Sequence, residues 1–94
     1  MKLISVEAEF PADRIEEAIG LFEEQAGTVR AMDCCAQYAL YRAPDAPRIA
    51  IVQQWRSMEA FDAYRASGTF ATLGQGLKPM MTKPPVTTVA EIEG

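Results

Sequence analysis

The chain has 94 residues, of which 49% are hydrophobic and 23% charged, and its formal net charge at pH 7 is −4. This length suits a single domain and leaves no room for a second core. The acidic balance argues against a nucleic-acid partner, and no run of about 18 apolar residues is present to span a membrane. Histidine is absent, which removes the commonest general base and the commonest ligand of haem iron and other metals.

The first elements predicted are a strand and a long helix. Residues from Leu3 to Phe10 alternate between apolar and polar, which is typical of a half-buried strand. Asp13, with Glu16 three residues later, predicts a capping box at the helix start, although Pro11 as the first helical residue is an alternative. Apolar residues then recur at the spacing of an amphipathic helix on a sheet. They are Ile15, Ala18, Ile19, Phe22, Ala26 and Val29.

Two strands are predicted next, over Cys35–Arg42 and Arg48–Trp55. The short connection at 43–47 holds two prolines and an aspartate, so the pair should form an antiparallel hairpin. Simple alternation places Cys35, Gln37, Ala39 and Tyr41 on one face of the first strand. It places Ala36, Tyr38 and Leu40 on the other face. One face of the second strand holds Ile49, Ile51, Gln53 and Trp55.

The last third of the chain predicts two short helices and a final strand. Ser57 is a good N-cap for a helix reaching about Ala66, a second helix follows from the spacing of Phe70, Leu73 and Leu77, and residues 86–92 alternate as a strand. With right-handed crossovers this order gives an α+β fold, a ferredoxin-like βαββαβ sandwich. Its four-stranded antiparallel sheet carries the helices on one face.

Both faces of the predicted sheet carry apolar residues. A domain this small buries only about two-thirds of its unfolded surface, so a partner that covers the bare face would stabilise it. We therefore expect a homodimer, in the form of a dimeric α+β barrel.

The two cysteines, Cys34 and Cys35, are adjacent. A disulfide between neighbours is strained, and two cysteines without histidine make a poor zinc site, so no metal is expected. An acid at Glu7 comes too early for a signal peptide. These features favour a reducing cytoplasm.

Three motifs resemble the antibiotic biosynthesis monooxygenase (ABM) superfamily. Residues 52–61, Val-Gln-Gln-Trp-Arg-Ser-Met-Glu-Ala-Phe, resemble its strand–Trp–Ser–x–Glu–Ala segment. Residues 33–41 resemble its Pro-Gly-Cys and following strand, and residues 67–70 resemble its Ser-Pro-His-Phe. The resemblance extends over essentially the whole chain and implies one ABM-like domain over residues 1–94.

The departures from the family pattern restrict the chemistry. Gln53 stands where the family often has Glu, and Tyr64 and Thr69 stand where it often has His. Asp33-Cys34 replaces the Pro-Gly. Members that hold haem iron through His, and isomerases that rely on His, are therefore disfavoured.

The resemblance implies oxygenation of phenols or quinols without metal or flavin. A deprotonated hydroxyaromatic reacts with dioxygen directly, so the protein need only supply a dry pocket and a site for the phenolate. We expect a cofactor-independent monooxygenase acting on a small aromatic or quinol-like ligand. The alternatives are a non-catalytic small-molecule-binding member and a small-molecule isomerase or lyase, so enzymatic activity itself stays open.

Three residues are candidates for catalysis, each with a purely structural alternative. Trp55 corresponds to the family's pocket Trp and could donate its indole N–H, or it is a core aromatic. Gln53 could donate to a quinone carbonyl, or it is a hydrogen-bonded strand residue. Tyr64 could relay a proton, or it is an interface tyrosine.

Candidates for substrate binding are Tyr38, Tyr41, Arg56 and Phe70. Tyr38 and Tyr41 point to opposite faces of their strand, so at most one belongs to a given pocket. Arg56 could steady a phenolate or be an ordinary surface arginine. Cys35 matches the family's cysteine and suits a small buried hydrophobe better than a nucleophile.

Overall fold

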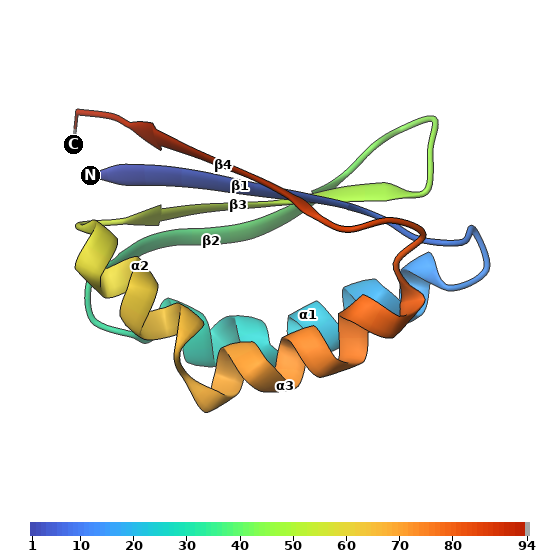
Figure 1. Ribbon diagram of the computed structural model, residues 1–94, viewed down its shortest axis with the longest axis horizontal. Helices are drawn as coiled ribbons and strands as arrows, with labels where there is room; N and C mark the ends of the chain where they lie inside the picture. The colour runs from blue at the N-terminus through green and yellow to red at the C-terminus, as the bar shows by residue number, and fades with distance from the viewer. Residues whose placement is uncertain (94) are drawn as a thin grey trace.

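A computed structural model describes residues 1–93, and Gly94, the last residue of the predicted domain, lies outside it. A sheet forms one layer and the helices form the other (Figure 1). The strands are β1 (Lys2–Glu9), β2 (Cys35–Arg42), β3 (Arg48–Trp55) and β4 (Val86–Glu91). The helices are α1 (Ile15–Arg30), α2 (Met58–Arg65) and α3 (Gly68–Leu77), and a 3-10 turn follows over Lys78–Met80.

The four strands lie in the order β2-β3-β1-β4, and every neighbouring pair is antiparallel. All three helices lie on one side of this sheet (Figure 1). The predicted α+β, ferredoxin-like fold is therefore confirmed. We call the face packed on the helices the inner face and the opposite one the outer face.

Helix α1 begins at Ile15, one residue later than the capping box predicted. Its N-cap is Arg14, and no side chain caps the helix, so the assignment of Asp13 as N-cap was wrong. The physical reason is a turn before the helix, in which the Arg14 N–H donates to the carbonyl of Pro11 at 2.9 Å. Ser57, in contrast, caps α2 as predicted by accepting from the Ala60 N–H.

Strand β2 contains a bulge that simple alternation did not anticipate. Cys35 pairs with Trp55 and Gln37 pairs with Gln54, so Ala36 is left over between them. The extra residue moves Cys35 to the inner face, where it packs against the core. The prediction that Cys35 shares a face with Tyr41 was therefore wrong.

The core lies between the inner face and the helices. Its largest fully buried side chains are Trp55, Phe10, Phe22, Ile4, Ile49 and Val29. The predicted stripe of α1 is confirmed, because five of its six members are buried and Ile19 packs against the core from a partly exposed position.

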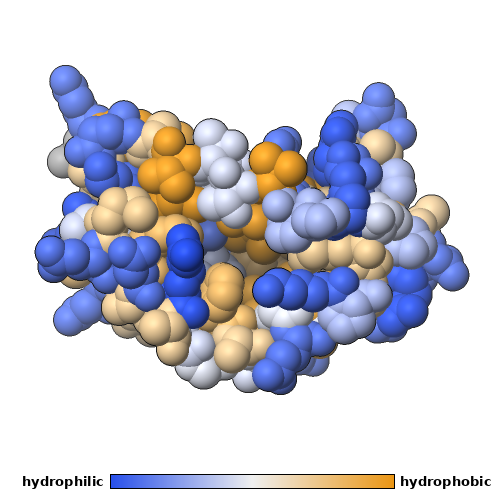
Figure 2. Space-filling view, in the orientation of Figure 1, coloured by the Kyte–Doolittle hydropathy of each residue, from blue (hydrophilic) through white to orange (hydrophobic). Residues whose placement is uncertain are grey.

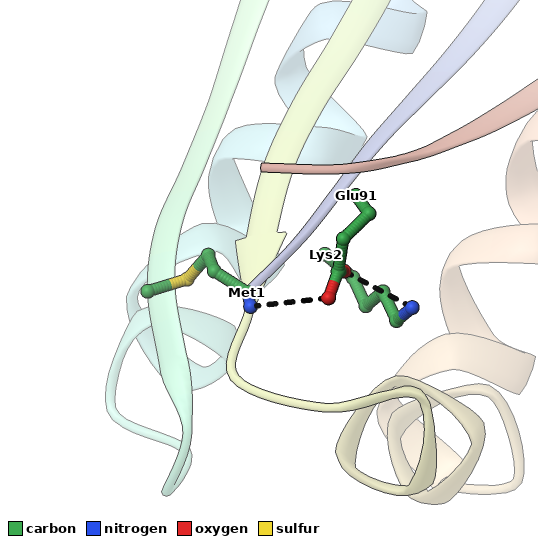
Figure 3. Close-up of polar contacts among 3 residues, drawn as sticks. All are labelled: Met1, Lys2 and Glu91. Atoms are coloured by element: carbon green, nitrogen blue, oxygen red, sulfur yellow. Dashed lines mark ion pairs between the residues drawn. The ribbon is translucent and has the colours of Figure 1, made fainter. Parts of the chain in front are cut away.

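Strand β4 is the exposed edge next to β1, and none of its residues is buried. At its end, the Glu91 carboxylate lies 3.0 Å from the Lys2 ammonium and 3.9 Å from the amino group of Met1 (Figure 3). The Ile92 N–H also donates to the Met1 carbonyl at 3.0 Å. These contacts hold the two termini together. Within residues 1–93 no helix is both long and apolar enough to cross a membrane.

Candidate functional site

A cavity of about 90 Å³ lies between the inner face and α3. Its walls are mostly apolar, and they come from β1, β2, β3, α2, α3 and the segment that leads to β4. The polar side chains among them are Tyr38, Gln53, Tyr64 and Lys78. A small apolar space with a few convergent polar groups is the usual form of a ligand site.

A larger groove of about 840 Å³ lies next to the cavity, between the edge strand β4 and the helices α2 and α3. Figure 2 shows a hollow there, with hydrophobic residues near its centre and hydrophilic ones at its rim. Both spaces are lined by Val6, Gln53, Phe70, Lys78 and Pro85. Because they share these residues, the groove adjoins the cavity.

Strand β3 positions the amide of Gln53 between the cavity and Trp55. Gln53 is only 3% exposed, and its Oε1 accepts the Trp55 indole N–H at 2.8 Å. An indole nitrogen can only donate, so this bond fixes which way the carboxamide is turned. The Gln53 NH₂ group is then the end left to donate to a ligand. Trp55 itself lines neither space and supports Gln53 from behind.

Two buried tyrosines meet at the wall of the cavity. The hydroxyl oxygens of Tyr38, from β2, and Tyr64, from α2, are 2.9 Å apart. The Tyr64 ring stacks on Trp55 at 5.2 Å between ring centroids, and the Tyr38 ring stacks on Phe22 at 4.9 Å. Aromatic packing from two sides therefore holds both hydroxyls in place.

Burial raises the pKa of both tyrosine hydroxyls above the ordinary value. Their mutual hydrogen bond raises the pKa of Tyr38 further but lowers that of Tyr64. Both side chains are therefore neutral at neutral pH.

The two cysteines line neither space, and only Cys35 lies near the tyrosine pair. Cys35 is partly buried, its thiol donates to the Gln37 carbonyl at 3.6 Å, and burial raises the pKa of that thiol. It is therefore a neutral thiol rather than an activated nucleophile. Cys34 is exposed and has a φ of 69°, in the left-handed region that favours glycine. Both thiols are free.

The structure brings together most of the predicted site residues. Phe70 lines both spaces, and its ring meets the Tyr64 ring edge-on at 5.3 Å between centroids, next to Tyr38 and Gln53. Tyr41 is instead 55% exposed, on the outer face. Arg56 is exposed at the end of β3 and lines neither space.

Three charged residues of the groove were absent from the predicted site. Asp62 and Arg65 come from α2, and Lys78 follows the last residue of α3. The sequence carries a signal only for Arg65, which lies four residues after Phe61 and so on the same side of α2 as an aromatic of the groove. Lys78 has no such signal, because it follows the end of α3. Residues 1–93 contain no cluster of three or more Cys, Asp or Glu side chains that could hold a metal.

Comparison with known proteins gives a family and a fold. Residues 1–74 match the family model described as antibiotic biosynthesis monooxygenase. No match was found among curated proteins.

Several solved structures share the architecture. One described as an antibiotic biosynthesis monooxygenase has a TM-score of 0.92 at 16% identity, with all of both chains covered. A protein from Caulobacter crescentus CB15 has a TM-score of 0.93 at 19% identity, covering 99% of this chain and 90% of that one. The protein Rv0793 from Mycobacterium tuberculosis has a TM-score of 0.85 at 22% identity, covering 100% and 97%. At such identities the likeness is one of fold.

Proposed function

Because this chain belongs to the antibiotic biosynthesis monooxygenase family, we propose that it is a cofactor-independent monooxygenase acting on a hydroxyaromatic or quinol. One observation supports this most. An apolar cavity between sheet and helices carries two neutral tyrosine hydroxyls and one amide on its wall. These are hydrogen-bond donors suited to a phenolate oxygen in a dry site.

The reaction needs no electron source besides the substrate. A phenol and dioxygen give a quinone and water: one oxygen atom enters the ring, the other leaves as water, and the substrate supplies all four electrons. The first step is loss of the hydroxyl proton, which makes the ring electron-rich enough to react with dioxygen. This proton and the displaced ring hydrogen end in the water that forms. The protein then has to bind the phenolate and keep water away.

In this proposal, Gln53 and Tyr64 bind the substrate oxygen. Either hydroxyl can be the donor in the 2.9 Å bond between Tyr38 and Tyr64, and in this proposal Tyr38 donates to Tyr64. The Tyr64 hydroxyl then donates its own proton to the substrate or relays one. Trp55 is a positioning residue that orients the Gln53 amide, and Phe70 packs on the ring of the substrate.

The test is dioxygen uptake with a panel of hydroquinones, naphthols and anthrones. We expect at least one of them to raise uptake above buffer, and Tyr64→Phe and Gln53→Leu to slow it by about tenfold or more, since a removed donor costs about 10²–10³ in other active sites. Tyr41→Phe, on the outer face, is the matched control and should leave the rate unchanged. No uptake with any member of the panel would overturn the proposal.

A second function, ligand binding without catalysis, is favoured by the state of the tyrosines. Both are held neutral, and the chain has no histidine to accept the substrate proton. In that case Trp55 fluorescence would report saturable binding of panel members while dioxygen uptake stays at the level of buffer. An isomerase would convert its ligand without consuming dioxygen.

We also propose that the chain is a homodimer in a reducing cytoplasm, where two free cysteines are stable. No helix covers the outer face, and its apolar side chains lie on all four strands (Figure 1). They include Leu3, Ala39, Tyr41, Ala50, Val52 and Val86. Sedimentation at micromolar concentration should give a dimer, and Val52→Lys should shift it toward monomer. A wild-type monomer under those conditions would contradict the dimer.

A further inference from the structure

Two cations face the groove without an internal counter-ion. Arg65 and Lys78 both line it, from α2 and from the turn after α3. Neither makes an ion pair with any of residues 1–93, whereas Lys2, Arg14, Arg42, Arg48 and Lys83 all do. In a protein with a net charge of −4, this pair is a local positive site.

The groove holds both cations close to the path of a ligand. The Arg65 guanidinium lies over the buried Phe61 ring, 5.3 Å from its centroid, which restricts its movement. Lys78 lines the groove and the cavity, so it lies where the two meet. Asp62 is the one acidic side chain among the described residues of the groove wall, so two positive charges face a single negative one.

The size of the cavity sets how a ligand is divided between the two spaces. A cavity of roughly 150 Å³ holds one benzene molecule, and the cavity here has about 90 Å³. It therefore admits one edge of a ring, the edge that bears the hydroxyl. The rest of the ligand lies in the groove, beside the two cations.

We propose that the ligand of this site is a hydroxyaromatic that carries a carboxylate, bound by Arg65 and Lys78 while the hydroxyl end enters the cavity. The inference rests on the site of the proposed function and adds the charge of its substrate. Arginine offers two parallel donors that match a carboxylate, and lysine adds a point charge. Both interactions weaken with salt because the groove is open to solvent.

The test compares a naphthol with the hydroxynaphthoate that differs from it only by a carboxylate, using titration calorimetry on the wild-type protein. We expect the carboxylate to tighten binding by about tenfold at low ionic strength, as two partly screened charged contacts would give, and the advantage to shrink in high salt. Equal or weaker binding of the hydroxynaphthoate, or none at all, would overturn the proposal.

Variants assign the effect to the two cations. Arg65→Gln and Lys78→Gln should each lower the preference for the carboxylate about threefold, and Asp62→Asn should raise it. Arg56→Gln and Lys83→Gln, which remove cations outside the groove, are matched controls and should not change it. If the preference disappears equally in the controls, the site lies elsewhere.

This experiment separates the inference from the proposed function. A carboxylate preference without dioxygen uptake refutes the monooxygenase and leaves the anion site standing. Dioxygen uptake with naphthol, without any preference for the carboxylate, refutes the anion site and leaves the monooxygenase standing.

Discussion

The two faces of the sheet use the same strands for different purposes. Tyr38 and Tyr41 lie three residues apart in β2, yet Tyr38 is 2% exposed and Tyr41 is 55% exposed. Tyr38 belongs to the inner face, with Gln53 and Trp55, and Tyr41 belongs to the outer face. In this fold the core and the candidate site share one face, so the side chains that would bind a ligand are also held by packing.

Polar groups differ between the faces in the same way. On the inner face Gln53 accepts a hydrogen bond from Trp55, and the hydroxyl of Tyr38 is hydrogen-bonded to that of Tyr64. No fully buried side-chain polar atom of residues 1–93 lacks a hydrogen-bond partner. In the isolated protomer, polar groups on the outer face have water as an alternative partner, so losing a hydrogen bond there costs little.

The largest expected effect contrasts a core residue with its outer counterpart. Phe22 is fully buried and stacks on Tyr38, so Phe22→Ala should lower the free energy of unfolding by about 3–5 kcal/mol. Tyr41→Ala should cost under about 0.5 kcal/mol in the monomer, and more only where the dimer forms. Urea unfolding at two protein concentrations checks this. A large loss for Tyr41→Ala that does not depend on concentration would contradict it.

The tyrosine pair should show coupling. Tyr38→Phe leaves the Tyr64 hydroxyl without its partner, and we expect each single variant to cost about 1–3 kcal/mol. The double variant should cost less than the sum, because it leaves no orphaned hydroxyl. Tyr41→Phe is the control. Strict additivity would show that the hydroxyl bond contributes nothing specific.

Alkaline pH should destabilise the protein through the same pair. The folded pKa values of Tyr38 and Tyr64 lie above the ordinary 10.0, so the unfolded chain loses these protons first. The stabilisation is complete below pH 10 and is lost as the pH rises further. Tyrosinate absorbance from the pair should appear only together with unfolding, followed by circular dichroism. Ionisation of Tyr38 and Tyr64 near pH 10 in the folded protein would contradict this.

A smaller gain is expected at the start of β2. Cys34 has a φ of 69°, where a side chain is unfavourable, and it stands where the family pattern has glycine. Cys34→Gly should therefore raise the free energy of unfolding by about 1 kcal/mol. Cys34→Ala removes the thiol but keeps the Cβ atom, so it should change little. Equal gains for the two variants would assign the effect to the thiol.

The smallest effect is expected at the exposed end of β4. The hydrogen bond and charge of Lys2 lower the pKa of the Glu91 carboxyl (Figure 3). The pair therefore stabilises the fold above the unfolded pKa of Glu91, and this contribution is lost as the pH falls through the folded value. Titration of Glu91 by NMR should show the pKa rising in Lys2→Gln and staying unchanged in Lys83→Gln. If the pKa of Glu91 is the same in Lys2→Gln as in the wild-type protein, the ion pair with Lys2 does not form in solution.

Much of the fold could be predicted because hydrophobic periodicity carries it. The stripe of α1 and the alternation of β3 are each compatible with only one buried face, so these faces follow from the sequence. The capping box at Asp13 failed because it depends on where a turn closes, which a backbone bond to Pro11 decides. The bulge at Ala36 failed because a strand pattern contains no sign of an inserted residue.

The candidate site was predictable only where it coincides with the inner face. Strand alternation placed Gln53 on one face with Trp55, and it put Tyr38 and Tyr41 on opposite faces without deciding between them. Tyr64 came from the family pattern. Arg65 and Lys78 were not predicted, because the groove forms between elements whose distance is set by tertiary packing. The role of Trp55 changed as well, since its indole N–H is already bound to Gln53.

The bulge at Ala36 shifts the side-chain alternation of β2 by one residue. Beyond it, even-numbered residues such as Tyr38 face the helices, while before it the odd-numbered Cys35 does. The bulge therefore allows an odd-numbered and an even-numbered residue to share the inner face. Deleting Ala36 would remove the extra residue and leave Cys35 and Tyr38 on that face in regular alternation, opposite Trp55 and Gln53. The strand therefore tolerates a shorter length at this point without moving Tyr38 away from Tyr64.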